Sequence, residues 1–176
     1  MPASLSNFRW AAEMGANIHA SCVALAAAGA PFGAPDDAAI LLIGPSGSGK
    51  SDLALRLIAA GAVLVADDRT DLTFENGQLI AAVPARLAGL IEVRGAGLVA
   101  LPHRARSRVV LAVRLAPGET LARLPRPEYW TPPQGLEAAR IPLLGVDPFE
   151  ASAPAKVAAA AAAFVHNRFR EALAPN

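Results

Sequence analysis

Short apolar runs, separated by glycine, proline and charged residues, follow one another along most of the chain. Runs of this kind are typical of buried strands, and they predict strands at 23–26, 39–43, 63–66, 70–74, 78–83 and 109–115. Residues 91–99 are predicted to form a strand that runs into a glycine-punctuated turn. The turn residues of 29–37 predict a hairpin with a long tip between the first two strands. Asn76-Gly77 predicts a tight hairpin, because this pair favours the turn that joins neighbouring antiparallel strands.

Two segments have the pattern of helices. In residues 50–60 leucine and isoleucine interleave with alanine, and Gly61 is a typical helix stop. Residues 155–173 are rich in alanine, the best helix former. The apolar side chains that recur in this second segment at i, i+4 spacing are Val165, Phe169 and Leu173.

Length and composition indicate one domain. A chain of 176 residues can bury a sizeable core, and Ala, Leu, Val and Ile must build it, because aromatic residues make up only 5%. We predict a single domain over 16–176, preceded by a tail or short helix over 1–15. Many of the prolines lie in 117–148, which we expect to be mostly loop, with a short helix around 135–139.

The charge balance and the single cysteine limit the partners and the cellular compartment expected for this protein. A net charge of +1 argues against nucleic acid as a general partner, because no basic excess exists to neutralise many phosphates. No apolar run approaches the length that spans a bilayer, so no membrane association is expected. Cys22 cannot form an internal disulfide and is predicted to be buried in a protein of a reducing, cytoplasmic compartment.

The segment after the second predicted strand carries the strongest chemical signal. It reads Gly44-Pro45-Ser46-Gly47-Ser48-Gly49-Lys50-Ser51 and matches the pattern G-x-x-x-x-G-K-[ST] at every fixed position. Its glycines allow several N–H groups to point at one anion, and the helix that follows adds the positive end of its dipole. Lys50 is then expected to reach the outer phosphates of a ligand, and the Ser51 hydroxyl to hold Mg²⁺.

Other acidic and basic residues stand near predicted strand ends. Asp67 and Asp68 end an apolar strand, where one carboxylate would complete a Mg²⁺ site or orient a nucleophile; an acidic turn is the alternative. Neighbouring strand residues point to opposite faces, so the two are not expected to share one role. Glu92 lies in an apolar run and is expected either to pair with Arg94 or to bind Mg²⁺. The basic residues of 103–108 read as a solvated turn or a dock for an acidic group.

Taken together, these features resemble the HPr kinase/phosphorylase family. The resemblance runs from Ile18 to the final helix. The residues that carry it are His19-Ala20-Ser21, the GPSGSGKS loop, Val65-Ala66-Asp67-Asp68-Arg69 and Glu92-Val93-Arg94-Gly95-Ala96-Gly97-Leu98. The last stretch looks like the family's own signature and is more specific than the loop alone.

The resemblance implies an activity and a set of roles. The activity is Mg²⁺-dependent phosphorylation by ATP of a serine on HPr, the phosphocarrier protein of the phosphotransferase system, with pyrophosphate as an alternative donor. Lys50 would bind the outer phosphates, and Ser51 and Glu92, with Asp67, would hold Mg²⁺. Asp68 would be the general base, supported by His19, an isolated histidine that would otherwise read as structural. Arg94 of the signature would join them as a catalytic residue.

The resemblance also implies a fold and an assembly. The family fold is α/β, with the phosphate loop on a mixed β-sheet with flanking helices, similar to phosphoenolpyruvate carboxykinase, and members are often hexamers. Long members carry an additional N-terminal domain, so this chain resembles the short form. They also carry an arginine-rich loop before the last helix, whereas no arginine lies here between Arg140 and Arg168. The missing arginines argue against the reverse, dephosphorylating reaction.

Two other functions fit the phosphate loop. A small-molecule kinase would need an arginine-rich lid, and 117–148 offers only Arg123, Arg126 and Arg140. A non-catalytic nucleotide-binding regulator would not need Asp68.

Overall fold

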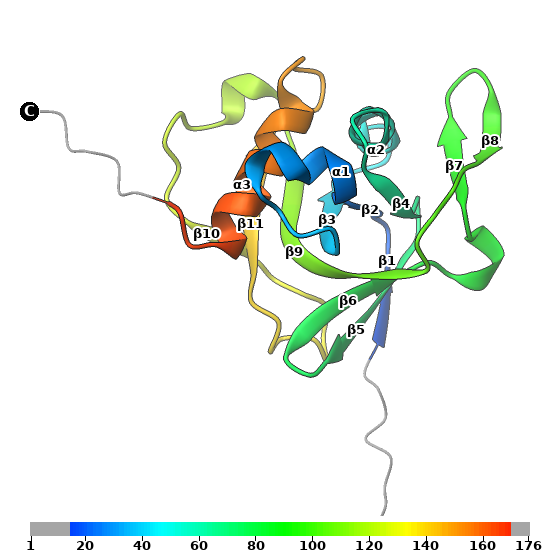
Figure 1. The fold of residues 1–176 in the computed structure, drawn as a ribbon, viewed down its shortest axis with the longest axis horizontal. Coiled ribbons are helices and arrows are strands. Elements are labelled where there is room, and N and C mark those ends of the chain that lie inside the picture. The colour runs from blue at the N-terminus through cyan, green and yellow to red at the C-terminus, as the bar shows by residue number, and fades with distance from the viewer. Residues whose placement is uncertain (1–14, 170–176) are drawn as a thin grey trace, which may run out of the picture.

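The structure, a computed structural model, describes residues 15–169 (Figure 1). Its helices are α1 (Ala26–Gly29), α2 (Lys50–Ala59) and α3 (Ala153–Val165). Its strands are β1 (Gly15–Ile18), β2 (Ser21–Ala24), β3 (Ala38–Ile43), β4 (Val63–Ala66), β5 (Thr70–Glu75), β6 (Gln78–Ala82), β7 (Leu90–Val93), β8 (Gly97–Ala100), β9 (Arg106–Leu115), β10 (Glu128–Trp130) and β11 (Ile141–Val146). Among residues 15–169, no helix is both long enough and apolar enough to cross a membrane.

The strands form a mixed nine-stranded sheet and a separate hairpin of β7 and β8. The sheet has the order β1-β5-β6-β9-β3-β2-β4, and β11 pairs with β9 and carries β10 on its other side. β9 is parallel to both β3 and β11, while β2 is antiparallel to β3 and to β4. The carboxyl ends of β3, β4, β9 and β11 therefore lie at one edge of the sheet, where open α/β sheets usually bind ligands. The α/β class with a mixed sheet is confirmed.

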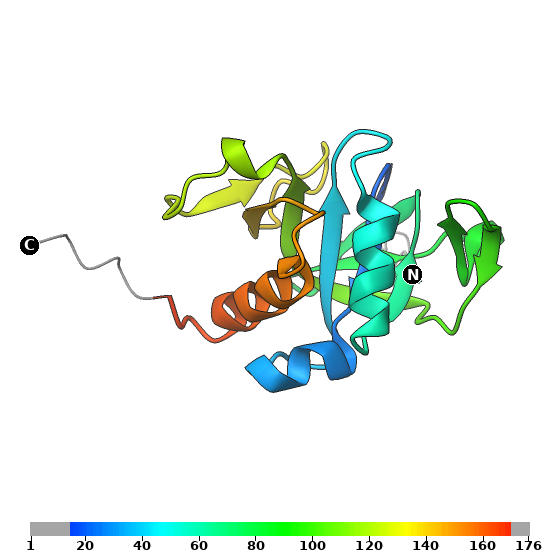
Figure 2. The ribbon, with the colours of Figure 1, turned by 90° about the horizontal axis from the view of Figure 1, so that it is seen from above.

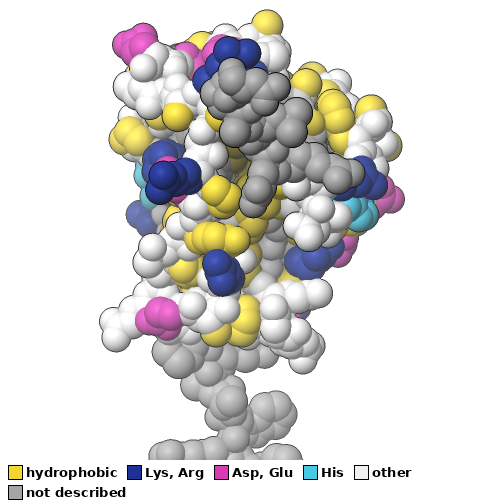
Figure 3. Space-filling view, turned by 90° about the vertical axis from the view of Figure 1, so that its left-hand side faces the viewer, with side chains coloured by type: hydrophobic (Ala, Val, Ile, Leu, Met, Phe, Trp, Pro, Cys, Tyr) yellow, Lys and Arg dark blue, Asp and Glu magenta, His cyan; other side chains and the backbone are white. Residues whose placement is uncertain are grey.

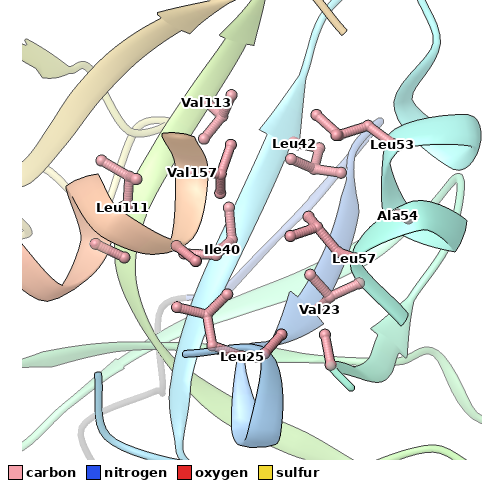
Figure 4. Close-up of a cluster of buried hydrophobic side chains, with 14 of the residues drawn as sticks. Val23, Leu25, Ile40, Leu42, Leu53, Ala54, Leu57, Leu111, Val113 and Val157 are labelled. Carbon is pink, nitrogen blue, oxygen red and sulfur yellow. The ribbon is translucent and has the colours of Figure 1, made fainter. Parts of the chain in front are cut away.

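The core lies on both faces of the central strand β3. Ile40 and Leu42 pack toward α2 and α3, in the cluster shown in Figure 4, while Ala39 and Leu41 pack on the opposite face. Figure 2 shows α2 and α3 side by side over one face of the sheet. A strand buried on both faces reads as an unbroken apolar run, because neither face needs polar residues. This explains why β3 was predictable from its sequence.

Several local predictions agree with the structure. The strands predicted at 39–43 and 63–66 correspond to β3 and β4, and β5 and β6 form the predicted tight hairpin. Its turn residues Asn76 and Gly77 have φ of 49° and 79°, as a two-residue hairpin of this kind requires. Cys22 is buried, and burial raises the pKa of its thiol.

Other boundaries differ from the prediction. The strand predicted at 23–26 ends at Ala24, and the long tip of its hairpin with β3 contains α1. The strand and glycine turn predicted within 91–99 are present as β7 and the turn at Gly95, which has a φ of 87°, but the chain then returns as a second strand, β8. The basic turn predicted at 103–108 is wrong in part: β9 begins at Arg106, which pairs with Glu75.

The largest corrections concern the last third of the chain. The loop predicted over 117–148 contains β10 and β11, and 135–139 forms turns instead of a helix. The helix predicted at 155–173 is α3, which begins at Ala153 and ends at Val165. Phe169 lies beyond the helix and is 56% exposed. Leu173, and residues 1–14 of the predicted tail, lie outside the described residues.

Charges are mixed on the surface. On the face shown in Figure 3, which includes the side of β10 and the end of α3, basic, acidic and hydrophobic side chains lie interspersed. This distribution fits the net charge of +1. The absence of nucleic-acid partners stays a prediction.

Candidate active site

The loop between β3 and α2 forms the floor of the site. Gly47 and Gly49 have φ of 78° and 95°, a left-handed conformation that side chains with a Cβ rarely adopt. A Cβ at Gly49 would also lie within 3.2–3.3 Å of Pro148 and Phe149. α2 begins directly after the loop, so the free N–H groups and positive dipole end of a ten-residue helix face the space above it. The backbone here is suited to bind an anion.

Lys50 spans this loop with its side chain. Its Nζ donates to the carbonyl oxygens of Gly44 and Pro45, each at 2.9 Å, and the residue is only 6% exposed. Burial lowers the pKa of the ammonium group, and the negative charges of Asp68 and Asp67 oppose that shift. A buried cation held by two neutral carbonyls lacks a full counter-charge, and a phosphate would supply one.

Asp67, at the end of β4, is the most heavily hydrogen-bonded acid of the site. It is 5% exposed, and its Oδ1 accepts hydrogen bonds from Ser21 Oγ at 2.6 Å and Ser51 Oγ at 2.9 Å. Its Oδ2 accepts a hydrogen bond from the Glu92 N–H at 3.0 Å. One carboxylate thus joins β2, α2, β4 and β7, and its negative charge is stabilised by these donors.

Asp68 differs from Asp67 in its backbone conformation, its exposure and its partner. It has a φ of 61°, its side chain is 69% exposed, and its Oδ1 lies 3.2 Å from Nε2 of His19. A non-glycine residue in the left-handed region costs free energy and is common at functional sites. The backbone turn sends the two carboxylates to different surroundings, which fits the expectation that they do not share one role.

The residues present fit the Mg²⁺ that the resemblance implies. Magnesium in phosphoryl-transfer sites takes one or two carboxylates and completes its shell with phosphate and water oxygens. The Ser51 hydroxyl and the Asp67 carboxylate are adjacent oxygens of this hard type, and Glu92 lines the same space. The part of the chain that the structure describes has no larger group of His, Cys, Asp or Glu that could hold a metal without such extra ligands.

The reasoning that led to Glu92 from the sequence is wrong in one respect. Glu92 is exposed, so its carboxylate does not bear the cost of burial in an apolar strand. Within residues 15–169, no ion pair joins Glu92 to Arg94. The structure therefore contradicts the pairing alternative and leaves both side chains directed to the cleft.

One cleft of about 380 Å³ brings the predicted residues together. Its predicted members are His19, Ser46, Gly47, Gly49, Lys50, Ser51, Asp67, Asp68, Glu92 and Arg94. Gly44, Pro45 and Ser48 belong to the predicted loop but do not line the cleft; the first two hold Lys50. Sequence reasoning missed Ser21, Asp52, Leu55, Val93 and Phe149 as lining residues.

Two of the missed residues differ in whether the sequence held a signal for them. Ser21 belongs to the His19-Ala20-Ser21 segment, which already pointed to the site, so this segment is the signal that could have identified it. In the structure its hydroxyl donates a hydrogen bond to Asp67. Phe149 lies about a hundred residues after the loop, in a segment read as irregular, and no local signal points to it.

Comparisons of sequence and of structure find similarity to HPr kinases. Residues 36–110 match the family model HPr Serine kinase C-terminal domain. The HPr kinase/phosphorylase of Clostridium tetani is 48% identical over 63 residues, which cover 36% of this chain and 21% of that protein. The HPr kinase/phosphorylase of Acidovorax sp. is 44% identical over 92 residues, which cover 48% of this chain and 29% of that protein. The chain thus spans less than a third of the length of these curated relatives.

A solved structure extends the match beyond these segments. The Hpr(Ser) kinase/phosphatase from Coxiella burnetii superposes with a TM-score of 0.65 at 25% identity, covering 87% of this chain and 95% of that chain. The matched family segment includes the phosphate loop, both aspartates and the signature stretch from Glu92 to Leu98. These matches support the resemblance predicted from the sequence: residues 36–110 are similar to the C-terminal domain of HPr serine kinases, and the fold is similar to that of the Coxiella burnetii protein.

Proposed function

We propose that this protein is a Mg²⁺-dependent kinase that transfers a phosphoryl group from ATP to a seryl residue of HPr. The observation that supports this most is the placement of Asp68 and His19 in the same cleft as Lys50 and the glycine loop. A phosphoryl donor held by the loop and an acceptor hydroxyl held at Asp68 would then meet in one space.

The first part of the mechanism is binding and charge stabilisation. The loop N–H groups and the end of α2 bind the phosphates, and Lys50 exchanges its carbonyl partners for phosphate oxygens. Ser51, Asp67 and Glu92 would hold Mg²⁺, which when bound neutralises charge on the phosphates. Fixed donors aimed at developing charge usually supply the largest share of catalysis.

The second part is the transfer itself. The seryl oxygen of the acceptor forms a bond to the terminal phosphorus, and the bond from that phosphorus to the bridging oxygen breaks, so that ADP leaves. The hydroxyl proton passes to the Asp68 carboxylate, which His19 orients from 3.2 Å. A loose transition state requires little proton removal until late, so a carboxylate is an adequate base. The 69% exposure of Asp68 leaves room for a serine presented by another protein.

The remaining expectations belong to the same proposal. Use of pyrophosphate, a homo-hexameric assembly and a cytoplasmic location follow from the resemblance or the composition. The dephosphorylating reaction is not part of the proposal, because the arginine-rich loop that long members carry before the last helix is missing here, with no arginine between Arg140 and Arg168.

The decisive experiment compares wild type with Asp68→Asn, using labelled ATP, Mg²⁺ and purified HPr. We expect transfer to a seryl residue of HPr to fall by about 10²- to 10⁴-fold in the variant, the usual contribution of a general base, while ATP binding persists. Asp36→Asn is the matched control, because Asp36 is exposed and lies outside the cleft.

Other results would identify the alternatives. Label on a small metabolite, with none on HPr, would indicate a small-molecule kinase. ATP binding without transfer to any acceptor would indicate a regulator, and an unchanged rate in Asp68→Asn would remove Asp68 from the mechanism.

A further inference from the structure

The turn between β11 and α3 carries an unusual aromatic residue. Phe149 is 71% exposed, although burial of a phenylalanine side chain is strongly favourable. It lines the cleft beside the glycine loop, where its ring lies next to Gly49. An exposed aromatic ring at the wall of a ligand cleft offers a flat apolar surface to whatever the cleft binds.

The Phe149 backbone is held in place at this wall. Asp147 Oδ1 accepts a hydrogen bond from the Phe149 N–H at 2.9 Å, and its Oδ2 accepts one from the Gly118 N–H at 2.9 Å. Pro148 is buried and lies against Gly49, so the turn is packed onto the loop itself. Arg56 of α2 donates to the Glu150 carbonyl at 3.1 Å and ties the turn to the helix. The turn is therefore a fixed part of the cleft wall.

The strand order places this wall opposite the candidate base. β4, which precedes Asp67 and Asp68, and β11, which precedes Phe149, lie two strands away from β3 on opposite sides. Figure 2 shows the connection from β11 to α3 on one side of β3 and the β7–β8 hairpin on the other. The phosphate loop follows β3 and lies between them. A donor with its terminal phosphate toward Asp68 must therefore extend its other end away from Asp68.

We infer that Phe149 stacks on the base of a nucleoside triphosphate and so selects a nucleotide over an inorganic polyphosphate as the phosphoryl donor. This inference rests on the proposed function and adds to it the residue that recognises the nucleotide part of the donor. Aromatic stacking tolerates any base, because every base has a π-face, so Phe149 favours nucleotides as a class. Inorganic pyrophosphate and tripolyphosphate have no base that could stack on the ring.

The test compares direct binding of two donors with and without a base. Wild type and Phe149→Ala are titrated calorimetrically with ATP and with tripolyphosphate, each with Mg²⁺ and at the same ionic strength. We expect the Kd for ATP to rise about 10-fold in Phe149→Ala, the scale of one lost stacking contact, and the Kd for tripolyphosphate to stay unchanged. Leu124→Ala is the control, because Leu124 is 72% exposed and lies outside the cleft.

A second variant gives a spectroscopic signature. Phe149→Trp keeps an aromatic ring, so we expect it to retain ATP affinity. Its added fluorescence should change on addition of ATP but not of tripolyphosphate. A surface residue without a role in binding would show no such difference.

Three results would overturn the inference. Unchanged ATP binding in Phe149→Ala, with a raised KM for HPr, would make Phe149 a contact for the protein substrate. An equal loss for ATP and tripolyphosphate would mean that Phe149 only supports the loop. If wild type binds neither donor, the phosphate site itself fails, and with it both this inference and the proposed function.

Discussion

The two walls of the cleft are built on different principles. On the β4 side, a buried carboxylate, Asp67, collects hydrogen bonds from Ser21, Ser51 and the Glu92 backbone. On the β11 side, the carboxylate of Asp147 also binds two backbone N–H groups, but the group presented to the cleft is an aromatic ring. Both walls thus use an aspartate to fix backbone, and they differ in what they display.

Under the proposed function, this difference would separate the chemical step from donor recognition. The β4 side displays charged and titratable groups, which in the proposed mechanism act on phosphate and on an acceptor proton. The β11 side displays an uncharged surface, which by our inference would discriminate between donors without taking part in bond making. Lys50 lies between the walls and is expected to serve both.

The largest effect should come from removing the central cation. We expect Lys50→Met to lower kcat/KM for HPr phosphorylation by at least about 10²- to 10³-fold, the cost of removing one preorganised charge-stabilising group, and to weaken ATP binding at the same time. Steady-state kinetics and calorimetric titration with ATP measure the two effects. Lys156→Met is the control, because Lys156 is exposed on α3, lies outside the cleft and pairs with Glu150. Wild-type turnover in Lys50→Met would show that the loop does not bind the donor as proposed.

The next largest effect should be a loss of stability when Asp67, the buried aspartate on the β4 side, is replaced. Asp67→Ala leaves the hydroxyl of Ser21 and the N–H of Glu92 without their acceptor. An unsatisfied buried donor costs about 1–3 kcal/mol, so we expect a loss of this size or more in the free energy of unfolding. Urea denaturation measures it, with Asp68→Asn as the comparison that should change stability far less, since Asp68 is exposed. Equal losses in both variants would mean that Asp67 is no more structural than its neighbour.

Local sequence patterns predicted the β4 side of the cleft well. β3, the glycine loop, α2 and β4 follow one another within thirty residues or so, and each has its own signal in apolar runs, glycines or helix formers. The strand end at Ala66 places both aspartates beside the loop. His19 and Glu92 come from more distant segments: Glu92 was expected either to pair with Arg94 or to bind Mg²⁺, and only the family resemblance identified His19 as a site residue.

The β11 side could not be predicted in the same way. β11 contains Pro142 and Gly145, which weaken any strand signal, and it is stabilised by parallel pairing with β9. Such pairing between distant segments leaves no local pattern. The start of α3 was also missed, because Pro154 reads as a helix breaker although proline is favoured in the first turn. Phe149 lies between these two elements, so its place in the cleft depended on both.

The chemistry of Asp67 shows a related limit. An acidic pair at a strand end does not reveal which carboxylate is buried, and alternation along a strand says only that the two differ. The distinction comes from the positive φ of Asp68 and from the approach of β2 and β7, which supply Ser21 and the Glu92 N–H. These features arise from the tertiary structure, and they leave Asp68 as the exposed carboxylate, the one to which the proposed mechanism gives the role of base.

The smallest effect is expected from replacing Asp147, which fixes the backbone on the β11 side of the cleft. Asp147→Ala removes two acceptor contacts from partly exposed backbone, and each such hydrogen bond contributes about 1 kcal/mol, so we expect a modest loss in stability by urea denaturation. Because the Phe149 backbone loses one of its anchors, ATP binding should weaken, though by less than in Phe149→Ala. Tripolyphosphate binding should stay at the wild-type level, a split that a purely structural defect would not produce. Equal weakening for both donors would mean that Asp147 supports the phosphate loop, and the two walls would then not divide chemistry from recognition.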